Sequence, residues 1–280
     1  MDASAAALVL LAALLHASWN VLVKAEGDGL LAIAGVSAGG AMMAAAMVPF
    51  VGIPDSRAWP YMAAALTFQF AYKRLLAEAY RHGDLSRIYP LVRGLPPLAL
   101  AALGWIVVGE RLSGAEMGAI ALVAAGILTL VFGTRSALDL RPVGYAVATA
   151  ATITAYTLLD GLGSRASGNA FAYVTCLIAL DGSIFAAYIA ATRGTSVLRA
   201  ALKRRRTTLV GGACGFASYA LVVWAFTMAP IALVAALRET SVVIAAIFGA
   251  LLLKERFGPP RIGAAILIAA GLALLKLNAG

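Results

Sequence analysis

Apolar residues in this chain form long runs, and short polar gaps separate them. A helix that crosses the hydrocarbon core of a bilayer needs about 20 apolar residues, and ten runs of this kind take up most of the 280 residues. The runs are rich in Ala and Leu and lack the two-residue alternation of barrel strands, so the pattern predicts an all-α integral membrane protein. The ten predicted transmembrane helices are Ala3–Val23, Leu30–Ile53, Trp59–Tyr80, Ile88–Gly109, Ala115–Phe132, Pro142–Leu159, Phe171–Ala191, Thr207–Met228, Ile231–Leu253 and Ile262–Lys276.

The composition agrees with this pattern. Charged residues make up 12% of the chain, against about 25% in an ordinary soluble domain, and the mean hydropathy is +0.91. These values exclude a soluble globular fold and a disordered chain. Most of the net charge of +9 lies in the gaps between apolar runs, as in loops of a membrane protein, so we expect no nucleic-acid partner. Cys176 and Cys214 lie inside apolar runs and indicate neither a disulfide framework nor a metal site.

The second half of the chain repeats part of the first. Residues 93–130 can be placed on residues 238–275 at a constant offset of 145, and 12 of these 38 positions are identical; chance would give roughly 4 in this Ala-rich composition. The identities include Arg93 with Arg238 and Glu110 with Glu255. We therefore predict two five-helix halves, residues 1–133 and 142–280, with a connecting loop at 134–141.

An odd number of helices per half has a topological consequence. Each half must then enter the membrane in the opposite sense, which is the inverted-repeat construction of many secondary transporters. In such proteins the substrate site lies between the halves near the bilayer midplane, and access alternates as one half rocks against the other. The sequence therefore predicts a transporter with a central cavity. The alternative is a duplicated scaffold with no transport role.

Each half ends in the same motif, Gly-x(5)-Glu-Arg-x(6)-Gly-Ala followed by Ala-Ala-Gly, at Gly104–Gly126 and Gly249–Gly271. With ten helices in two halves, this motif resembles the drug/metabolite transporter (DMT) superfamily over essentially the whole chain, and within it the EamA-type exporters. The resemblance implies export of amino acids, including aromatic ones, and other small metabolites across the cell membrane, in bacteria the inner membrane. It implies no cofactor.

The first helix departs from one branch of that superfamily. Small multidrug exporters carry a membrane-embedded Glu in this helix, whereas Ala3–Val23 contains no acidic residue. A proton-coupled cation antiporter of that type is therefore disfavoured, although protons remain open as a coupling ion. The side on which the termini lie is also open. Loop charges place both termini outside the cell by the positive-inside rule, whereas the resemblance implies that they face the cytoplasm.

Polar side chains are costly at membrane depth, so each one is a candidate site residue. His16, Trp19 and Asn20 share one face of the first helix, and Gln69, Tyr72 and Lys73 have the same spacing in the third. The alternatives are bonding of His16 and Asn20 to neighbouring helices and snorkelling of Lys73 to an interface.

The fourth and ninth runs supply the matched pair Arg93 and Arg238. Tyr89-Pro90, Pro96 and Pro97 surround Arg93 and predict a broken helix. Two guanidinium groups could clamp a substrate carboxylate. Glu239 could bind the substrate ammonium, titrate, or form an ion pair within its own helix. Tyr156, Tyr219 and Trp224 are expected to line an apolar cavity. The predicted substrate-binding residues are His16, Trp19, Asn20, Gln69, Tyr72, Lys73, Tyr89, Arg93, Tyr156, Tyr219, Trp224, Arg238 and Glu239.

Enzyme motifs are absent from the sequence. There is no His-Glu-x-x-His zinc motif and no Walker loop, and Ser18 lies on a different helix face from His16. We therefore expect a non-enzyme whose partners are small zwitterionic metabolites and membrane lipid. Two alternatives stay open: an amine exporter with Glu239 or Asp181 as counter-ion, and a membrane-embedded enzyme of unknown chemistry.

Overall fold

The computed structural model describes residues 1–26, 29–82, 85–130, 140–252 and 259–277, and within these residues it is helical without strands. Two π-helical segments, Gly104–Val108 and Thr207–Gly211, extend α4 and precede α9, and a 3-10 turn spans Ser56–Ala58. The α-helices are α1 (Ala3–Ala25), α2 (Gly29–Val51), α3 (Trp59–His82), α4 (Leu85–Leu103), α5 (Gly114–Thr129), α6 (Leu140–Ala166), α7 (Ala170–Arg193), α8 (Thr195–Lys203), α9 (Gly212–Ala225), α10 (Ile231–Arg238), α11 (Thr240–Leu252) and α12 (Pro259–Leu277).

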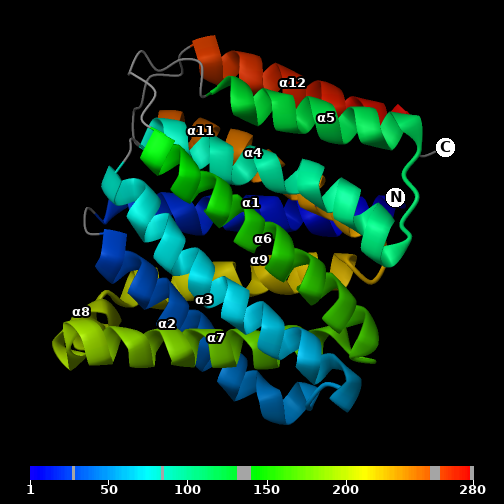
Figure 1. Ribbon diagram of the computed structural model, residues 1–280. Helices are drawn as coiled ribbons and strands as arrows, with labels where there is room; N and C mark the ends of the chain where they lie inside the picture. Colours follow the sequence, from blue (N-terminus) through cyan, green and yellow to red (C-terminus); the bar gives the residue numbers. More distant parts are fainter. Residues whose placement is uncertain (27–28, 83–84, 131–139, 253–258, 278–280) are drawn as a thin grey trace.

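The long helices run side by side between two ends of the molecule (Figure 1). The start of α1 and the end of α12 lie at the same end, which we call the terminal end, and α8 lies at the opposite one. The most extensive helix pairs are α3 with α6, α5 with α12, α2 with α7, and α1 with α9. Each of these pairs joins a helix of the first half of the chain to one of the second, so the two halves interleave.

Two helix starts are fixed by capping side chains. The Asp2 carboxylate accepts a hydrogen bond of 2.7 Å from the Ala5 amide at the start of α1, and this bond holds the pKa of Asp2 below its ordinary value. At the start of α5, the Ser113 hydroxyl accepts from the Glu116 amide while the Glu116 carboxylate accepts from the Ser113 amide. Both caps satisfy amides that would otherwise lack partners at a helix end.

Seven helical segments among the described residues are long and apolar enough to cross a membrane. The chain is thus a membrane protein with many apolar helices, but the predicted count of ten transmembrane helices is not confirmed by these criteria. Gly114–Thr129 and Ile262–Leu275 are apolar but shorter, and α3 carries Lys73, Arg74, Glu78 and Arg81. The structure also divides the ninth predicted run into α10 and α11, and it forms α8 from a segment predicted as a loop.

The crossing of α5 and α12 is reciprocal in the two halves. A Cβ added to Gly126 would meet the Ala264 carbonyl oxygen at 3.0 Å, and one added to Gly271 would meet the Ala119 carbonyl oxygen at 2.9 Å. Residues 264 and 271 lie 145 positions after residues 119 and 126. The repeat therefore converts the contact of Gly126 with Ala264 into the contact of Gly271 with Ala119. Residues 134–139 of the predicted connecting loop at 134–141 lie outside the described residues, as do Glu255 and Arg256, whereas residues 140 and 141 begin α6.

A second close crossing joins α2 to the π-helical segment before α9. A Cβ on Gly39 would overlap the Thr208 carbonyl oxygen, and one on Gly212 would lie 2.7 Å from the Gly39 carbonyl carbon. The adjacent Gly40 is different, since its added Cβ would come no closer than 3.5 Å to the Gly212 carbonyl oxygen. Glycine at position 39 is therefore required by backbone contact.

Gly39→Ala is expected to prevent normal packing of α2, because the backbone of the Thr207–Gly211 segment would have to move. Gly40→Ala is the matched control one residue away, and it should fold like the wild type because its methyl group finds ordinary contact distances. The recovery of monodisperse protein in size-exclusion chromatography and the thermal unfolding midpoint would measure the difference. Equal behaviour of the two variants would contradict the packing described here.

Candidate functional site

An interruption of the helix between α10 and α11 marks the centre of the candidate site. The Glu239 amide bonds to the Ala236 carbonyl at 3.1 Å, and the Val242 amide bonds to the Glu239 carbonyl at 2.9 Å. Both bonds span three residues instead of the four of an α-helix, so the chain tightens at the junction of Arg238 and Glu239.

The first-half counterpart of this segment is not interrupted. α4 is one helix from Leu85 to Leu103 although it contains Pro90, Pro96 and Pro97, so the broken helix predicted around Arg93 is wrong. α4 packs against α5, α6 and α10, and it remains a continuous helix within this packing. Pro96 and Pro97 have no amide hydrogens, and the carbonyls four residues before them therefore lose their helical donors.

An ion pair links the two halves at this interruption. Arg93 Nε on α4 lies 2.9 Å from Glu239 Oε2, and the exposed fractions of the two residues are 9% and 6%. Glu239 thus has its closest cation on another helix, and the ion pair within its own helix that we considered from the sequence is not formed with Arg238 at salt-bridge distance. A buried pair of this kind restricts how α4 and α10 can sit, since separating the charges would leave each uncompensated.

The two arginines keep hydrogen-bonding capacity that the described residues do not use. Arg93 Nε and Nη2 and Arg238 Nε are buried without hydrogen-bond partners; Arg93 Nε is near Glu239 but not aligned for a hydrogen bond. Buried donors in proteins are nearly always paired. Two guanidinium groups and one carboxylate leave one positive charge in excess. The site is therefore suited to an anionic group such as a carboxylate.

Aromatic side chains surround the charged groups. The guanidinium carbon of Arg238 lies 5.6 Å from the centre of the Tyr219 ring, and the rings of Tyr72 and Tyr156 meet edge to face at 5.8 Å. Four further residues of this region interact electrostatically with both Arg93 and Arg238. These residues are His16, Tyr72, Tyr89 and Tyr156. The structure thus brings together eight of the thirteen predicted site residues.

Three predicted site residues lie beside this cluster and form hydrogen bonds or ion pairs with other residues. Lys73 Nζ lies 2.6 Å and 2.7 Å from the two carboxylate oxygens of Asp181 and 4.7 Å from the centre of the Phe185 ring, so its charge is already paired. The Asn20 side-chain amide donates to the His16 carbonyl one turn earlier at 2.7 Å. Gln69 donates to Asp160 at 3.1 Å.

The two predicted tryptophans have different positions. Trp19 packs against His16 with ring centres 5.1 Å apart and stays beside the cluster. Trp224 lies at the end of α9, is 37% exposed, and packs against Phe171. Together with Arg165 and Asn169 these two residues line a pocket of about 540 Å³ at the terminal end. The structure does not place Trp224 in the central cluster.

Asp160 is a central residue that was not among the predicted binding residues. It is fully buried on α6. Its Oδ1 accepts a hydrogen bond of 2.9 Å from the Tyr173 hydroxyl, and its Oδ2 accepts from Gln69 and from the Tyr219 hydroxyl. The sequence does show that Asp160 follows Tyr156 by one turn on the same face of the helix. Its hydrogen-bond donors lie on three other helices and could not be inferred from that spacing.

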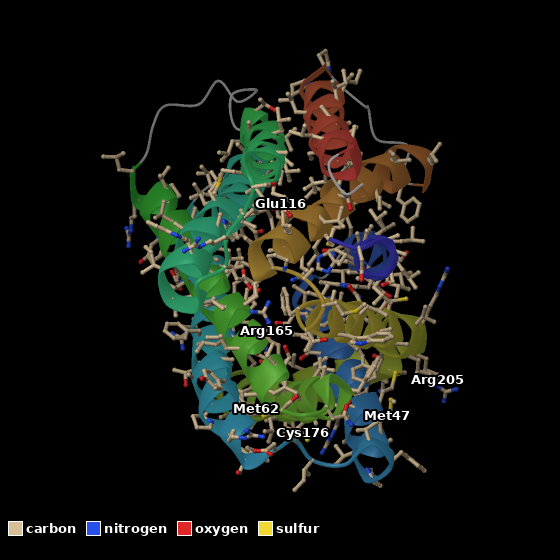
Figure 2. The ribbon with its side chains drawn as sticks, turned by 90° about the vertical axis from the view of Figure 1, so that its right-hand side faces the viewer. Met47, Met62, Glu116, Arg165, Cys176 and Arg205 are labelled. Carbon is tan, nitrogen blue, oxygen red and sulfur yellow. The ribbon has the colours of Figure 1, made fainter. Side chains whose placement is uncertain are left out.

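The Glu110 of the repeated motif acts at the terminal end. Its carboxylate accepts from Arg165 Nη2 at 2.7 Å and from the Ile231 amide at the start of α10. Arg165 also donates to the carbonyls of Phe226 and Ala229. Figure 2 views this end of the molecule and labels Arg165 near its centre. Glu110 thus joins the first half to two elements of the second half, as a structural or gate contact would.

These features define the class of the molecule as a polytopic helical membrane protein with a buried, charged centre. Residues 141–277 match the EamA-like transporter family, which belongs to the DMT superfamily. A solved crystal structure is similar with a TM-score of 0.76 and 19% identity, and the match covers 100% of this chain and 98% of that one. At this identity the likeness shows the fold alone. The comparison with curated proteins gives no match.

Arg93→Met is expected to lower the free energy of unfolding by about 3 kcal/mol, because Glu239 would keep its charge without its partner. The double variant Arg93→Met with Glu239→Met should recover most of that loss, since no unpaired carboxylate remains. Arg57→Met is the control for loss of an arginine, because its ion pair with Asp55 is solvent-exposed. Unfolding in detergent would measure these three variants and the single variant Glu239→Met. A double variant as unstable as the sum of its single variants would contradict a direct Arg93–Glu239 interaction.

Proposed function

We propose that this protein is a secondary transporter that exports amino acids, including aromatic and other bulky apolar ones, and related small metabolites across the cell membrane by alternating access. The observation that carries the proposal is the pair of arginines at the junction of the halves, the buried Arg93 and the half-buried Arg238, which both keep buried donors without partners among the described residues. Its setting in a chain with a transporter-family domain makes a transported anion-bearing solute the natural ligand.

The chemistry of the cluster matches both ends of a zwitterion. The planar fork of an arginine fits a carboxylate with two parallel hydrogen bonds, and Arg93 and Arg238 supply such donors from opposite halves. Glu239 could turn from Arg93 to the substrate ammonium once the substrate carboxylate engages Arg93. A zwitterion adds no net charge to the buried cluster, and each of its two charged groups would meet a group of opposite sign.

The aromatic residues indicate how the side chain of the substrate would be held. Tyr72, Tyr156 and Tyr219 present ring surfaces next to the arginines, and such surfaces favour apolar and aromatic groups. Small polar substrates would gain less from this wall. The preference for bulky apolar amino acids therefore follows from the same residues that surround the anion site.

We further propose that ten segments cross the membrane as two inverted five-helix repeats. The ten would be α1, α2, α3, α4 with its π-helical extension, α5, α6, α7, the π-helical segment with α9, α10 with α11, and α12. The reciprocal contacts of α5 and α12 support this arrangement. The helix pairs support it as well. The repeat places α1 on α6 and α3 on α9, so it converts the packed pair of α3 and α6 into the packed pair of α9 and α1.

The two alternatives fit the contacts less well. An amine exporter with Glu239 or Asp181 as counter-ion needs that carboxylate to be free, but both are already paired, with Arg93 and Lys73 respectively. An enzyme would need an activated nucleophile, and the Ser18 hydroxyl beside His16 instead donates to the Leu14 carbonyl at 2.9 Å. Neither alternative uses the unpaired donors of Arg93 and Arg238.

Counterflow in proteoliposomes tests the proposal. Liposomes preloaded with unlabelled phenylalanine should take up labelled phenylalanine faster than protein-free liposomes, and Arg238→Gln should lose this uptake because one half of the carboxylate site is gone. Arg57→Gln should transport like the wild type, since Arg57 is exposed at the terminal end.

Three results would contradict the proposal. Uptake of a quaternary amine without uptake of any amino acid would favour the amine exporter, and chemical conversion of the tested compound, seen by mass spectrometry, would favour an enzyme. Normal phenylalanine counterflow by a correctly folded Arg238→Gln variant would show that Arg238 is only structural.

A further inference from the structure

Asp160 differs from the other acidic residues around the centre of the molecule. Glu239 pairs with Arg93, Asp181 with Lys73, and Glu110 with Arg165. Among the described residues no cationic group lies within salt-bridge distance of Asp160, which is fully buried. Its carboxyl group is held only by neutral donors, Tyr173, Tyr219 and Gln69.

This environment can satisfy both protonation states of a carboxyl group. Hydrogen bonds from three neutral donors stabilise the carboxylate, but they do not supply the opposite charge that a buried anion needs. When the carboxyl group is protonated it becomes a donor itself, and a tyrosine hydroxyl can turn from donor to acceptor. Rotation of one hydroxyl group would therefore accommodate the proton without moving a helix.

Asp160 is connected to the candidate substrate site through a single side chain. The Tyr219 hydroxyl donates to Asp160, and the ring of the same residue lies against the Arg238 guanidinium. A substrate that changes the position of Arg238 would thus act on the residue that hydrogen-bonds Asp160. Several other charged or titratable groups on helices packed against α6 also face this region, namely Tyr72 and Lys73 on α3, Tyr89 and Arg93 on α4, Asp181 on α7, and Glu239 after α10.

We propose that Asp160 is the proton-binding residue of the transport cycle, and that it takes up a proton in one conformation and releases it in the other. The step is the addition of one proton to the carboxylate and its return to water when the opposite end of the site opens. The inference rests on the proposed transport function and assigns its coupling ion. A proton suits the site better than a metal ion, because the groups around Asp160 all donate hydrogen bonds to it, and the described residues hold no cluster of three or more metal-ligating side chains.

Proton movement and substrate movement can be measured in the same proteoliposomes. Vesicles that contain a pH-sensitive dye and an outward phenylalanine gradient should show a substrate-dependent change of internal pH with the wild-type protein. Asp160→Asn cannot titrate, so it should move phenylalanine without a pH change above that of protein-free vesicles. Asp55→Asn removes an exposed carboxylate at the terminal end and should give the wild-type pH signal.

The outcomes separate this inference from the transport function. Absence of phenylalanine counterflow with the wild type would defeat the transport proposal itself. Wild-type phenylalanine movement without a pH change, or with a requirement for sodium, would overturn the assignment of the proton alone. A pH signal retained by Asp160→Asn would do the same.

Tyr219→Phe keeps the test decisive if Asp160→Asn does not fold. This variant retains the ring beside Arg238 and removes only the hydroxyl group that stabilises the carboxylate. We therefore expect the midpoint of the pH profile of phenylalanine transport, normalised to the maximal rate of each variant, to move toward higher pH. Tyr80→Phe, a change near the end of α3, should leave the profile unchanged. An unshifted midpoint in Tyr219→Phe would overturn the role of Asp160.

Discussion

The ion pair between Arg93 and Glu239 is the interaction on which the centre of this molecule depends. Hydrocarbon cannot solvate either charge, so each group must keep the other close. Since one lies on α4 and the other at the interruption between α10 and α11, the pair fixes two halves of the chain against each other. It also leaves Arg238 without a carboxylate of its own and gives the centre its excess of positive charge.

Close backbone crossings make that centre possible. α5 meets α12 at Gly126 and Gly271, and α2 meets the segment before α9 at Gly39 and Gly212. Without a hydrophobic drive between helices in lipid, such close approach and interhelical polar bonds provide much of the association energy. The reciprocal form of the first crossing explains why the repeated Ala and Gly residues of the two halves match in sequence. They form two sides of one contact.

Much of this architecture could be predicted from the sequence because apolar runs and repeats are local or linear features. Arg93 and Arg238 could be singled out since charges inside apolar runs are rare and the repeat pairs them. The partners of Lys73 and Asp160 could not be predicted, because they lie on other helices, between 13 and 108 positions away in the chain, and depend on which faces of the helices meet. The prolines of α4 were misleading for a related reason, because α4 stays one continuous helix packed against three neighbours, and the interruption lies in its counterpart.

Equilibrium binding of phenylalanine and phenylalaninamide to the purified protein tests the central claim most directly. The two compounds share the ammonium group and the ring, and only the amino acid carries a carboxylate. If Arg93 and Arg238 form an anion site, phenylalanine should raise the thermal unfolding midpoint in a saturable way and the amide should not. Equal stabilisation by the two compounds would contradict a carboxylate site at Arg93 and Arg238.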